Sequence, residues 1–121
     1  MTIENAIYRI RQIKPNEYPD DQLVEWLSNL DKQVWDEVVY WHESDIPEPP
    51  TYTMDDLNVQ LLIPEPFTDV YVKFLCMEID FYNNEITRYN NSSVAFGKAL
   101  SNYADWFNRR HLPKQSVYVV I

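Results

Sequence analysis

The sequence predicts a mainly α-helical protein, a four-helix bundle-like single domain spanning residues 1–121. Three observations lead to this prediction. Apolar residues recur at spacings of three and four over most of the chain, which is typical of amphipathic helices. The longest stretch without proline, 67–112, is long enough for two helices that fold back on each other. Hydrophobic residues make up 45% of the chain, which is enough for one core and argues against disorder.

The C-terminal half predicts a long helical hairpin with helices over 67–82 and 85–110. Pro66 suits the first turn of the first helix, since its missing N–H is not needed there. Asn83 and Asn84 favour a reversal at 83–85, because asparagine tolerates the left-handed conformation that ends helices. The polar run 90–93 then falls inside the second helix, because an apolar seven-residue repeat continues through it. The repeat comprises Tyr82, Ile86, Tyr89, Ser93, Phe96, Leu100, Tyr103 and Phe107.

The N-terminal half predicts two further helices, over 2–14 and 20–41. Thr2 can cap the first, which must end before Pro15. Asp20 or Asp21 opens the second and places acidic side chains at its positive end. Apolar stripes on all four helices predict a common core: Ile7, Ile10, Leu27, Leu30, Val34, Leu75, Ile79, Ile86, Phe96, Leu100 and Phe107.

Three segments do not follow the helical pattern. Residues 42–56 are acidic and rich in proline, which predicts an exposed loop. In residues 58–63 the apolar Val59, Leu61 and Ile63 alternate with the other three residues, which predicts a short strand. Residues 54–62 could instead form one or two helical turns. The C-terminal residues 114–121 end in five apolar side chains, and we expect a docking strand there. These two strands would form a minor two-stranded element, with each other or with another chain, because neither is stable alone.

Acidic residues are concentrated in the N-terminal half. The net charge is −9, and residues 15–72 contain fourteen acids and a single base, Lys32. Direct binding of nucleic acid is disfavoured, because phosphate contacts need clustered lysine and arginine. Two interpretations remain: a solvated surface that keeps the protein soluble, or a face that meets a basic surface of another copy or repels passing DNA.

Candidate catalytic residues are few. His42, Glu43 and Asp45 lie close together but lack the second histidine of a zinc site. Cys76 follows an apolar helical position, which predicts a buried and unreactive thiol. The single glycine of the chain excludes glycine-rich phosphate loops. We therefore expect no enzymatic activity, no cofactor and no metal.

The polar run 90–93 and Gly97 predict tertiary contacts along the last helix. Asparagine and serine form helices poorly, so four in a row imply a partner: the acidic loop of the same subunit, or a polar seam with a neighbour. Inside a helix, glycine at position 97 lowers the stability of the helix by roughly 1 kcal/mol relative to alanine. We expect close approach of another helix to compensate for it.

Several stretches of the chain resemble small proteins encoded by tailed bacteriophages of Gram-positive hosts. The resemblance covers about residues 3–113. Its motifs are Ile10–Asn16, Trp26–Asp31, Leu62–Phe67, Ile79–Ser92 and Ala104–His111. In size and helical organisation such proteins are similar to head-to-tail connector, or head-completion, proteins, which bind beneath the portal as a ring. That class has no catalytic residues.

The resemblance implies a structural, adaptor-like role in virion assembly. The expected partners are copies of the chain itself and phage portal or neck proteins, with no specific nucleic acid, membrane or small-molecule substrate. The expected location is the host cytoplasm during assembly and then the virion, which agrees with Met1–Asn5 not resembling a signal peptide. The alternative is an acidic DNA mimic that inhibits a host DNA-binding enzyme. The candidate interaction residues are Glu43, Asp45, Glu48, Asn90, Asn91, Val117, Tyr118 and Val119.

Overall fold

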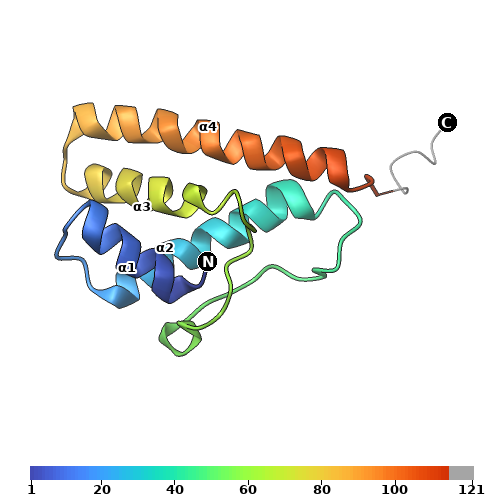
Figure 1. Ribbon diagram of the computed structural model, residues 1–121, viewed down its shortest axis with the longest axis horizontal. Helices are drawn as coiled ribbons and strands as arrows, with labels where there is room; N and C mark the ends of the chain where they lie inside the picture. Colours follow the sequence, from blue (N-terminus) through green and yellow to red (C-terminus); the bar gives the residue numbers. More distant parts are fainter. Residues whose placement is uncertain (115–121) are drawn as a thin grey trace.

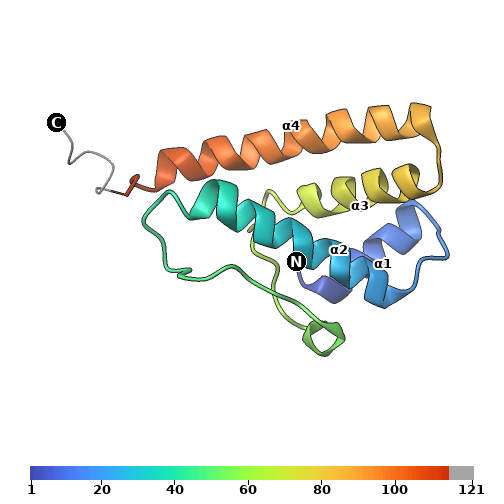
Figure 2. The same ribbon diagram turned by 180° about the vertical axis from the view of Figure 1, so that it is seen from behind.

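The computed structural model describes residues 1–114 and shows a mainly helical bundle, as the sequence predicts. The helical hairpin, formed by the last two helices, runs along one side of the molecule (Figures 1 and 2). Among residues 1–114, no helix combines the length and apolar character needed to cross a bilayer. In chain order the elements are α1 (Ile3–Ile13), α2 (Asp20–Val34), the π-helical turn η1 (Trp35–Val39), the 3₁₀ turn η2 (Met54–Asp56), α3 (Asp69–Tyr82) and α4 (Ile86–Arg110).

Local sequence signals account for most helix ends. The Thr2 side chain accepts a hydrogen bond from the Asn5 N–H and the Asn5 side chain accepts one from the Thr2 N–H, which forms a capping box. The hairpin reverses at 83–85, where Asn84 has a φ of 58°. The polar run 90–93 lies inside α4. The predicted position of the reversal is therefore confirmed.

Two helix boundaries differ from the prediction by two residues or more. Helix α3 begins at Asp69 rather than 67, because residues 64–67 form a turn closed by the Phe67 N–H and the Pro64 carbonyl. Helix α2 ends at Val34, and η1 continues it in π geometry to Val39, two residues short of the predicted end.

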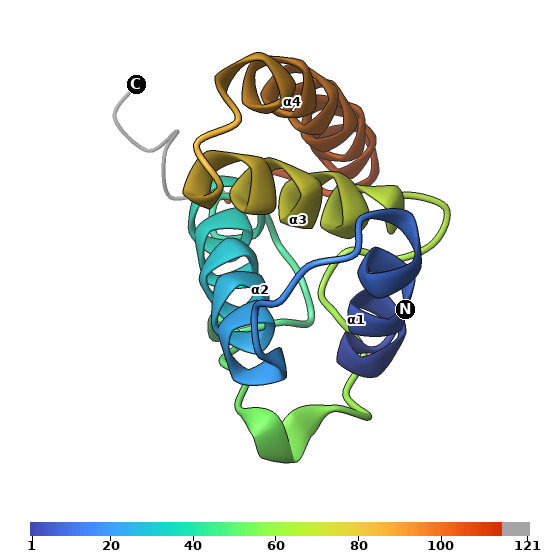
Figure 3. The same cartoon turned by 90° about the vertical axis from the view of Figure 1, so that its left-hand side faces the viewer.

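The helices form three layers, which are visible in the end-on view (Figure 3). Helix α3 lies between α4 on one side and the pair α1 and α2 on the other, and it contacts all three. This central position explains why α3 buries residues around most of its circumference. Its buried residues are Val70, Tyr71, Val72, Leu75, Ile79 and Asp80.

Burial along α4 increases from its N-terminus to its C-terminus. Eight predicted core residues are buried, whereas Phe96 and Leu100 are half-buried against the core and Ile86 is 73% exposed. The prediction for Ile86 is wrong because α4 packs on α3 alone at that end. Only its C-terminal end also contacts η1 (Figure 1). The buried eight are Ile7, Ile10, Leu27, Leu30, Val34, Leu75, Ile79 and Phe107.

The segment 58–63 is not a strand. It runs beside the N-terminus, where the Ile3 N–H donates to the Val59 carbonyl and the Leu61 N–H donates to the Met1 carbonyl. Only an isolated antiparallel bridge, between Thr2 and Gln60, marks this pairing. The turn η2 agrees in part with the alternative interpretation of helical turns over 54–62. The predicted partner strand at 116–121 lies outside the described residues.

Gly97 does not mark a close helix contact. Among the described residues, no heavy atom outside its own helix backbone and chain neighbours lies within 4 Å of the position that a Cβ would occupy. The side of α4 on which Gly97 lies faces solvent, so the expected compensation for the glycine is absent there.

Candidate interaction surfaces

The acidic loop begins beside the end of α4. The Glu43 N–H donates to the Leu112 carbonyl (2.9 Å), and the Lys114 N–H donates to the Trp41 carbonyl (3.1 Å). The His42 ring lies edge-on to Phe107, with ring centroids 5.3 Å apart. These contacts fix the start of the loop. The predicted interaction residues Glu43, Asp45 and Glu48 are exposed beyond this anchor.

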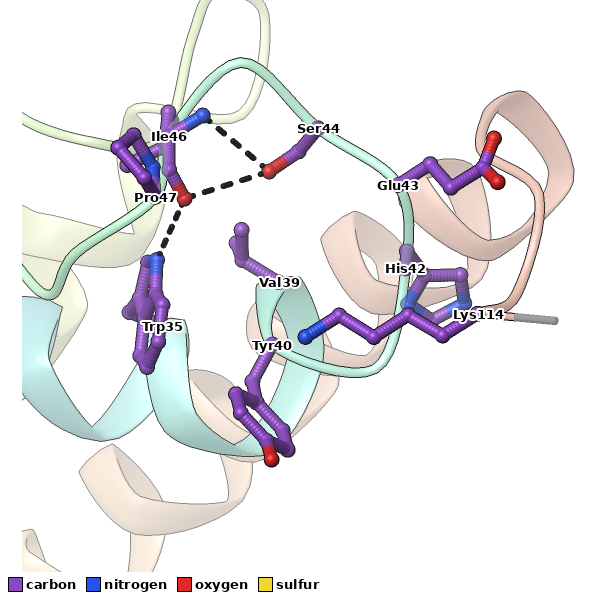
Figure 4. Close-up of a pocket in the computed structure, with 9 residues that line it drawn as sticks. All are labelled: Trp35, Val39, Tyr40, His42, Glu43, Ser44, Ile46, Pro47 and Lys114. Atoms are coloured by element: carbon purple, nitrogen blue, oxygen red, sulfur yellow. Dashed lines mark hydrogen bonds between the residues drawn. The ribbon is translucent and has the colours of Figure 1, made fainter. Parts of the chain in front are cut away.

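A pocket of about 320 Å³ lies at this anchor (Figure 4). The Trp35 Nε1–H donates to the Ile46 carbonyl oxygen at 3.0 Å, which fixes one wall. The Lys114 ammonium lies 3.9 Å from the centroid of the Tyr40 ring. The His42 Nδ1 is 2.8 Å from the Val38 carbonyl oxygen and is therefore engaged with the backbone. The lining mixes aromatic, aliphatic and polar residues, and its one aliphatic hydroxyl, that of Ser44, bonds the Ile46 backbone rather than a base.

The chain places one carboxylate of the acidic half in the core, and sequence analysis missed it. Asp31 of α2 is fully buried. It accepts hydrogen bonds from the hydroxyls of Tyr52 (2.5 Å) and Tyr71 (2.7 Å) and from the Leu62 N–H (2.9 Å). The Tyr71 hydroxyl in turn accepts from the Ile63 N–H at 2.7 Å. Asp31 thus joins α2, α3 and both ends of the 52–63 connection.

Burial governs the acid–base properties of this cluster. Desolvation raises the pKa of Asp31, while its three hydrogen bonds act in the opposite direction. The pKa values of Tyr52 and Tyr71 are raised by desolvation and then by the nearby Asp31 carboxylate. The same two causes raise the pKa of Tyr103 to about 12. The tyrosines therefore remain hydrogen-bond donors at neutral pH, and the cluster serves to hold the fold together.

A second buried carboxylate is the partner of Ser92 in the polar run of α4. Asp80 of α3 is 1% exposed, and its Oδ1 lies 2.5 Å from the Lys14 ammonium. The Ser92 hydroxyl donates to its Oδ2 at 2.6 Å. Ser92 therefore contacts α3 of the same chain, and the predicted contact of the run 90–93 with the acidic loop is wrong. The loop starts at the opposite end of α4 (Figure 1).

The helix reversal carries an exposed aromatic pocket. We define the turn pocket by Phe81, Ile86 and Tyr89. Its lining also includes Asp80, Asn84, Glu85 and Asn90. Its volume is about 340 Å³, and the Phe81 and Tyr89 rings lie 5.4 Å apart. In the sequence, the seven-residue apolar repeat was the signal that could have pointed to this pocket. It assigned Ile86 to the core, although the surface at that position is open.

The structure separates the predicted interaction residues. Glu43 and the acidic loop lie at the C-terminal end of α4, whereas Asn90 and Asn91 are exposed near its N-terminal end. Asn90 contributes to the turn pocket. Val117, Tyr118 and Val119 lie outside the described residues.

The described residues provide little chemistry for catalysis. Within residues 1–114, no three histidine, cysteine, aspartate or glutamate side chains are grouped to hold a metal ion. Cys76 is half-buried rather than fully buried, and desolvation raises the pKa of its thiol, which disfavours the reactive thiolate. Desolvation also raises the pKa of Glu78.

Comparisons with protein-family models, curated proteins and solved structures find no match to this chain.

Proposed function

We propose that this chain is a structural protein of tailed-phage assembly, a head-to-tail connector or adaptor that forms a ring below the portal. The proposal extends the resemblance of residues 3–113 to small phage proteins. In the structure, one observation supports it: most acids of the chain lie on α2, η1 and the connection to α3, whereas α4 carries mainly bases.

The charges are divided unequally between the elements. Helix α2, η1 and the connection to α3, residues 20–68, contain twelve acids and one base, Lys32. Helix α4 contains four bases and one acid. Helix α3 lies between the acid-rich α2 and the base-rich α4 (Figure 3), and the acidic loop starts beside the C-terminal end of α4.

Such a distribution suits repeated contacts between copies. The acidic side of one copy can meet the basic α4 of the next, which is a heterologous contact and closes into a ring when the rotation permits. Acidic residues left facing a central channel would repel the DNA backbone and let the duplex pass without binding. The expected partners are copies of the chain and portal or neck proteins, met in the host cytoplasm and retained in the virion.

Mass measurement tests this proposal directly. The purified chain is measured by native mass spectrometry across concentrations, with and without a portal protein. We expect a closed oligomer, at the latest when portal is present. A chain that remains monomeric under all these conditions, and does not bind portal, would refute the connector role.

Charge variants then test the supporting observation. Arg109→Gln with Arg110→Gln should weaken assembly at least tenfold, whereas Arg9→Gln, an exposed base on α1, should not. Replacing the loop acids by glutamine should weaken assembly and leave the thermal midpoint nearly unchanged, since exposed charges contribute little to folding. Added salt should weaken wild-type assembly in the same way. The loop acids are Glu43, Asp45 and Glu48.

The second candidate is an acidic DNA mimic, and the placement of Asp21, Glu25 and Asp36 favours it. These carboxylates are exposed on the continuous helical segment of α2 and η1, which holds them at fixed separations. A mimic would compete with duplex DNA for the basic groove of a host DNA-binding enzyme. Displacement of labelled duplex from such an enzyme, without assembly on portal, would select this function over the connector.

A further inference from the structure

The turn pocket lacks a partner in the described part of the chain. Phe81 is 53% exposed and Ile86 is 73% exposed, and both line the pocket together with Tyr89, beside Asp80 and Glu85. Solvent-exposed apolar pockets of this kind mark interaction sites. The Asn84 and Asn90 amides in its lining can donate to and accept from the backbone of an extended segment.

The sequence contains a segment of matching chemistry. Residues 117–121 are five consecutive apolar side chains, one of them Tyr118. An apolar segment of this length requires cover from water. Two sites in the same chain could provide it: the predicted pairing with 58–63, and the pocket beside Lys114.

The first of these sites is already occupied. Of the backbone N–H groups in 58–63, that of Val59 donates to the Asp56 carbonyl and that of Leu61 to Met1. The Leu62 N–H donates to Asp31, and the Ile63 N–H donates to Tyr71. Few donors therefore remain for a further strand.

The second site is partly covered. The Lys114 side chain lies across the pocket, with its ammonium against Tyr40 (Figure 4). An apolar segment that entered here would displace this cation from the Tyr40 face.

Geometry prevents the C-terminal segment from reaching its own turn pocket. Helix α4 has 25 residues and is therefore about 37 Å long at 1.5 Å per residue. The pocket lies at its N-terminal end, and Lys114 is bonded to Trp41 beyond its C-terminal end (Figure 1). The seven residues 115–121 span at most about 25 Å when fully extended. Any occupation of the turn pocket by this segment must therefore come from another copy.

We propose that residues 117–121 of one copy bind the turn pocket of the next copy, with Val117, Tyr118 or Val119 inserted between Phe81, Ile86 and Tyr89. The inference rests on the proposed ring and names the contact that links its subunits. Donor segment and acceptor pocket lie at opposite ends of α4, so each copy uses both once. That arrangement is heterologous and continues from copy to copy until it closes.

Complementary variants of the full-length chain test this contact. Ile86→Asp disables the pocket, and Val117→Asp with Val119→Asp disables the segment. Val94→Asp is the matched control, since Val94 is 72% exposed on α4 and does not line the pocket. We expect the thermal midpoint of Ile86→Asp to stay within about 2 °C of wild type, because the side chain is exposed and an acid suits the first turn of a helix.

Native mass spectrometry gives the result. Each disabled variant should be monomeric, Val94→Asp should assemble like wild type, and a mixture of the two disabled variants should stop at a heterodimer through the one intact contact. Assembly of Ile86→Asp at wild-type concentrations would overturn the inference. If the segment variant alone is monomeric, the segment binds elsewhere, and the inference fails while the ring remains.

A peptide of residues 114–121 distinguishes failure of the contact from failure of the ring. It is titrated into the full-length Val117→Asp, Val119→Asp variant and followed by NMR. Shifts at Phe81, Ile86 and Tyr89 support the contact even if the wild type never forms a ring. Shifts confined to Trp35 and Tyr40, which indicate binding beside Lys114, or no shifts at millimolar peptide, would overturn it.

Discussion

Replacement of Asp31 by alanine should destabilise the fold more than replacement of any other acid in the N-terminal half. The substitution removes the acceptor for three donors, the hydroxyls of Tyr52 and Tyr71 and the Leu62 N–H. All three donors lie in or at the edge of the core, and Tyr52 is only 7% exposed. The loss therefore reaches α3 and both ends of the 52–63 connection at once.

The magnitude follows from these donors. A buried donor left without an acceptor costs about 1–3 kcal/mol, so three would cost roughly 3–9 kcal/mol. Removing the buried charge offsets several kcal/mol of this cost, and the half-buried Leu62 can recruit water. We expect a net loss of about 3–4 kcal/mol in the free energy of unfolding. For a chain of this length the thermal midpoint should fall by about 10–15 °C.

Urea denaturation followed by circular dichroism measures this loss. Asp36→Ala is the control, because Asp36 is exposed on the same helical segment and should change stability by less than about 0.5 kcal/mol. A double-mutant cycle adds Tyr71→Phe, which should cost less in the Asp31→Ala background than in wild type. Equal losses for Asp31→Ala and Asp36→Ala would refute the role assigned to the buried carboxylate.

Three further predictions concern other parts of the molecule. Lys14→Met should lower the free energy of unfolding by about 2–4 kcal/mol in urea titrations, since it leaves the buried Asp80 carboxylate with Ser92 as its remaining partner. Gly97→Ala should raise the free energy of unfolding by about 0.5–1 kcal/mol, and with it the thermal midpoint, because the position is helical and open. A lower thermal midpoint would indicate a contact that the structure does not contain. Burial raises the pKa of Asp31 above its ordinary 3.8, so the folded chain retains this proton to a higher pH than the unfolded chain does. Denaturation midpoints measured from about pH 4 to 7 should therefore fall more for wild type than for Asp31→Asn as the pH rises through the folded pKa.

The features that sequence reasoning predicted well are those that local chemistry determines. Thr2 caps α1 because its side chain reaches an N–H three residues away, and Asn83 and Asn84 reverse the chain because Asn84 adopts a positive φ. The helical phase of α4 continues through 90–93 for the same kind of reason: the apolar repeat is a property of the segment itself.

The features that sequence reasoning missed depend on contacts between residues that are far apart in the sequence. Asp31 lies one residue after Leu30 and three before Val34, so its position on the buried face was available from spacing. Its partners are 21 to 40 residues away and could not be found in that way. The pattern likewise marks Ile86 as apolar but does not determine whether a neighbour covers it, because α3 is the only helix beside that end of α4.

The two buried carboxylates clarify what the remaining acids do. Of the fourteen acids in 15–72, Asp31 is the one that the described structure buries, and the others stay at or near the surface. Exposed like charges crowded on one side repel each other and lower the stability of the fold. In the proposed ring, a partner surface of opposite charge would remove this repulsion on contact, and the four bases on α4 of a second copy would provide such a surface.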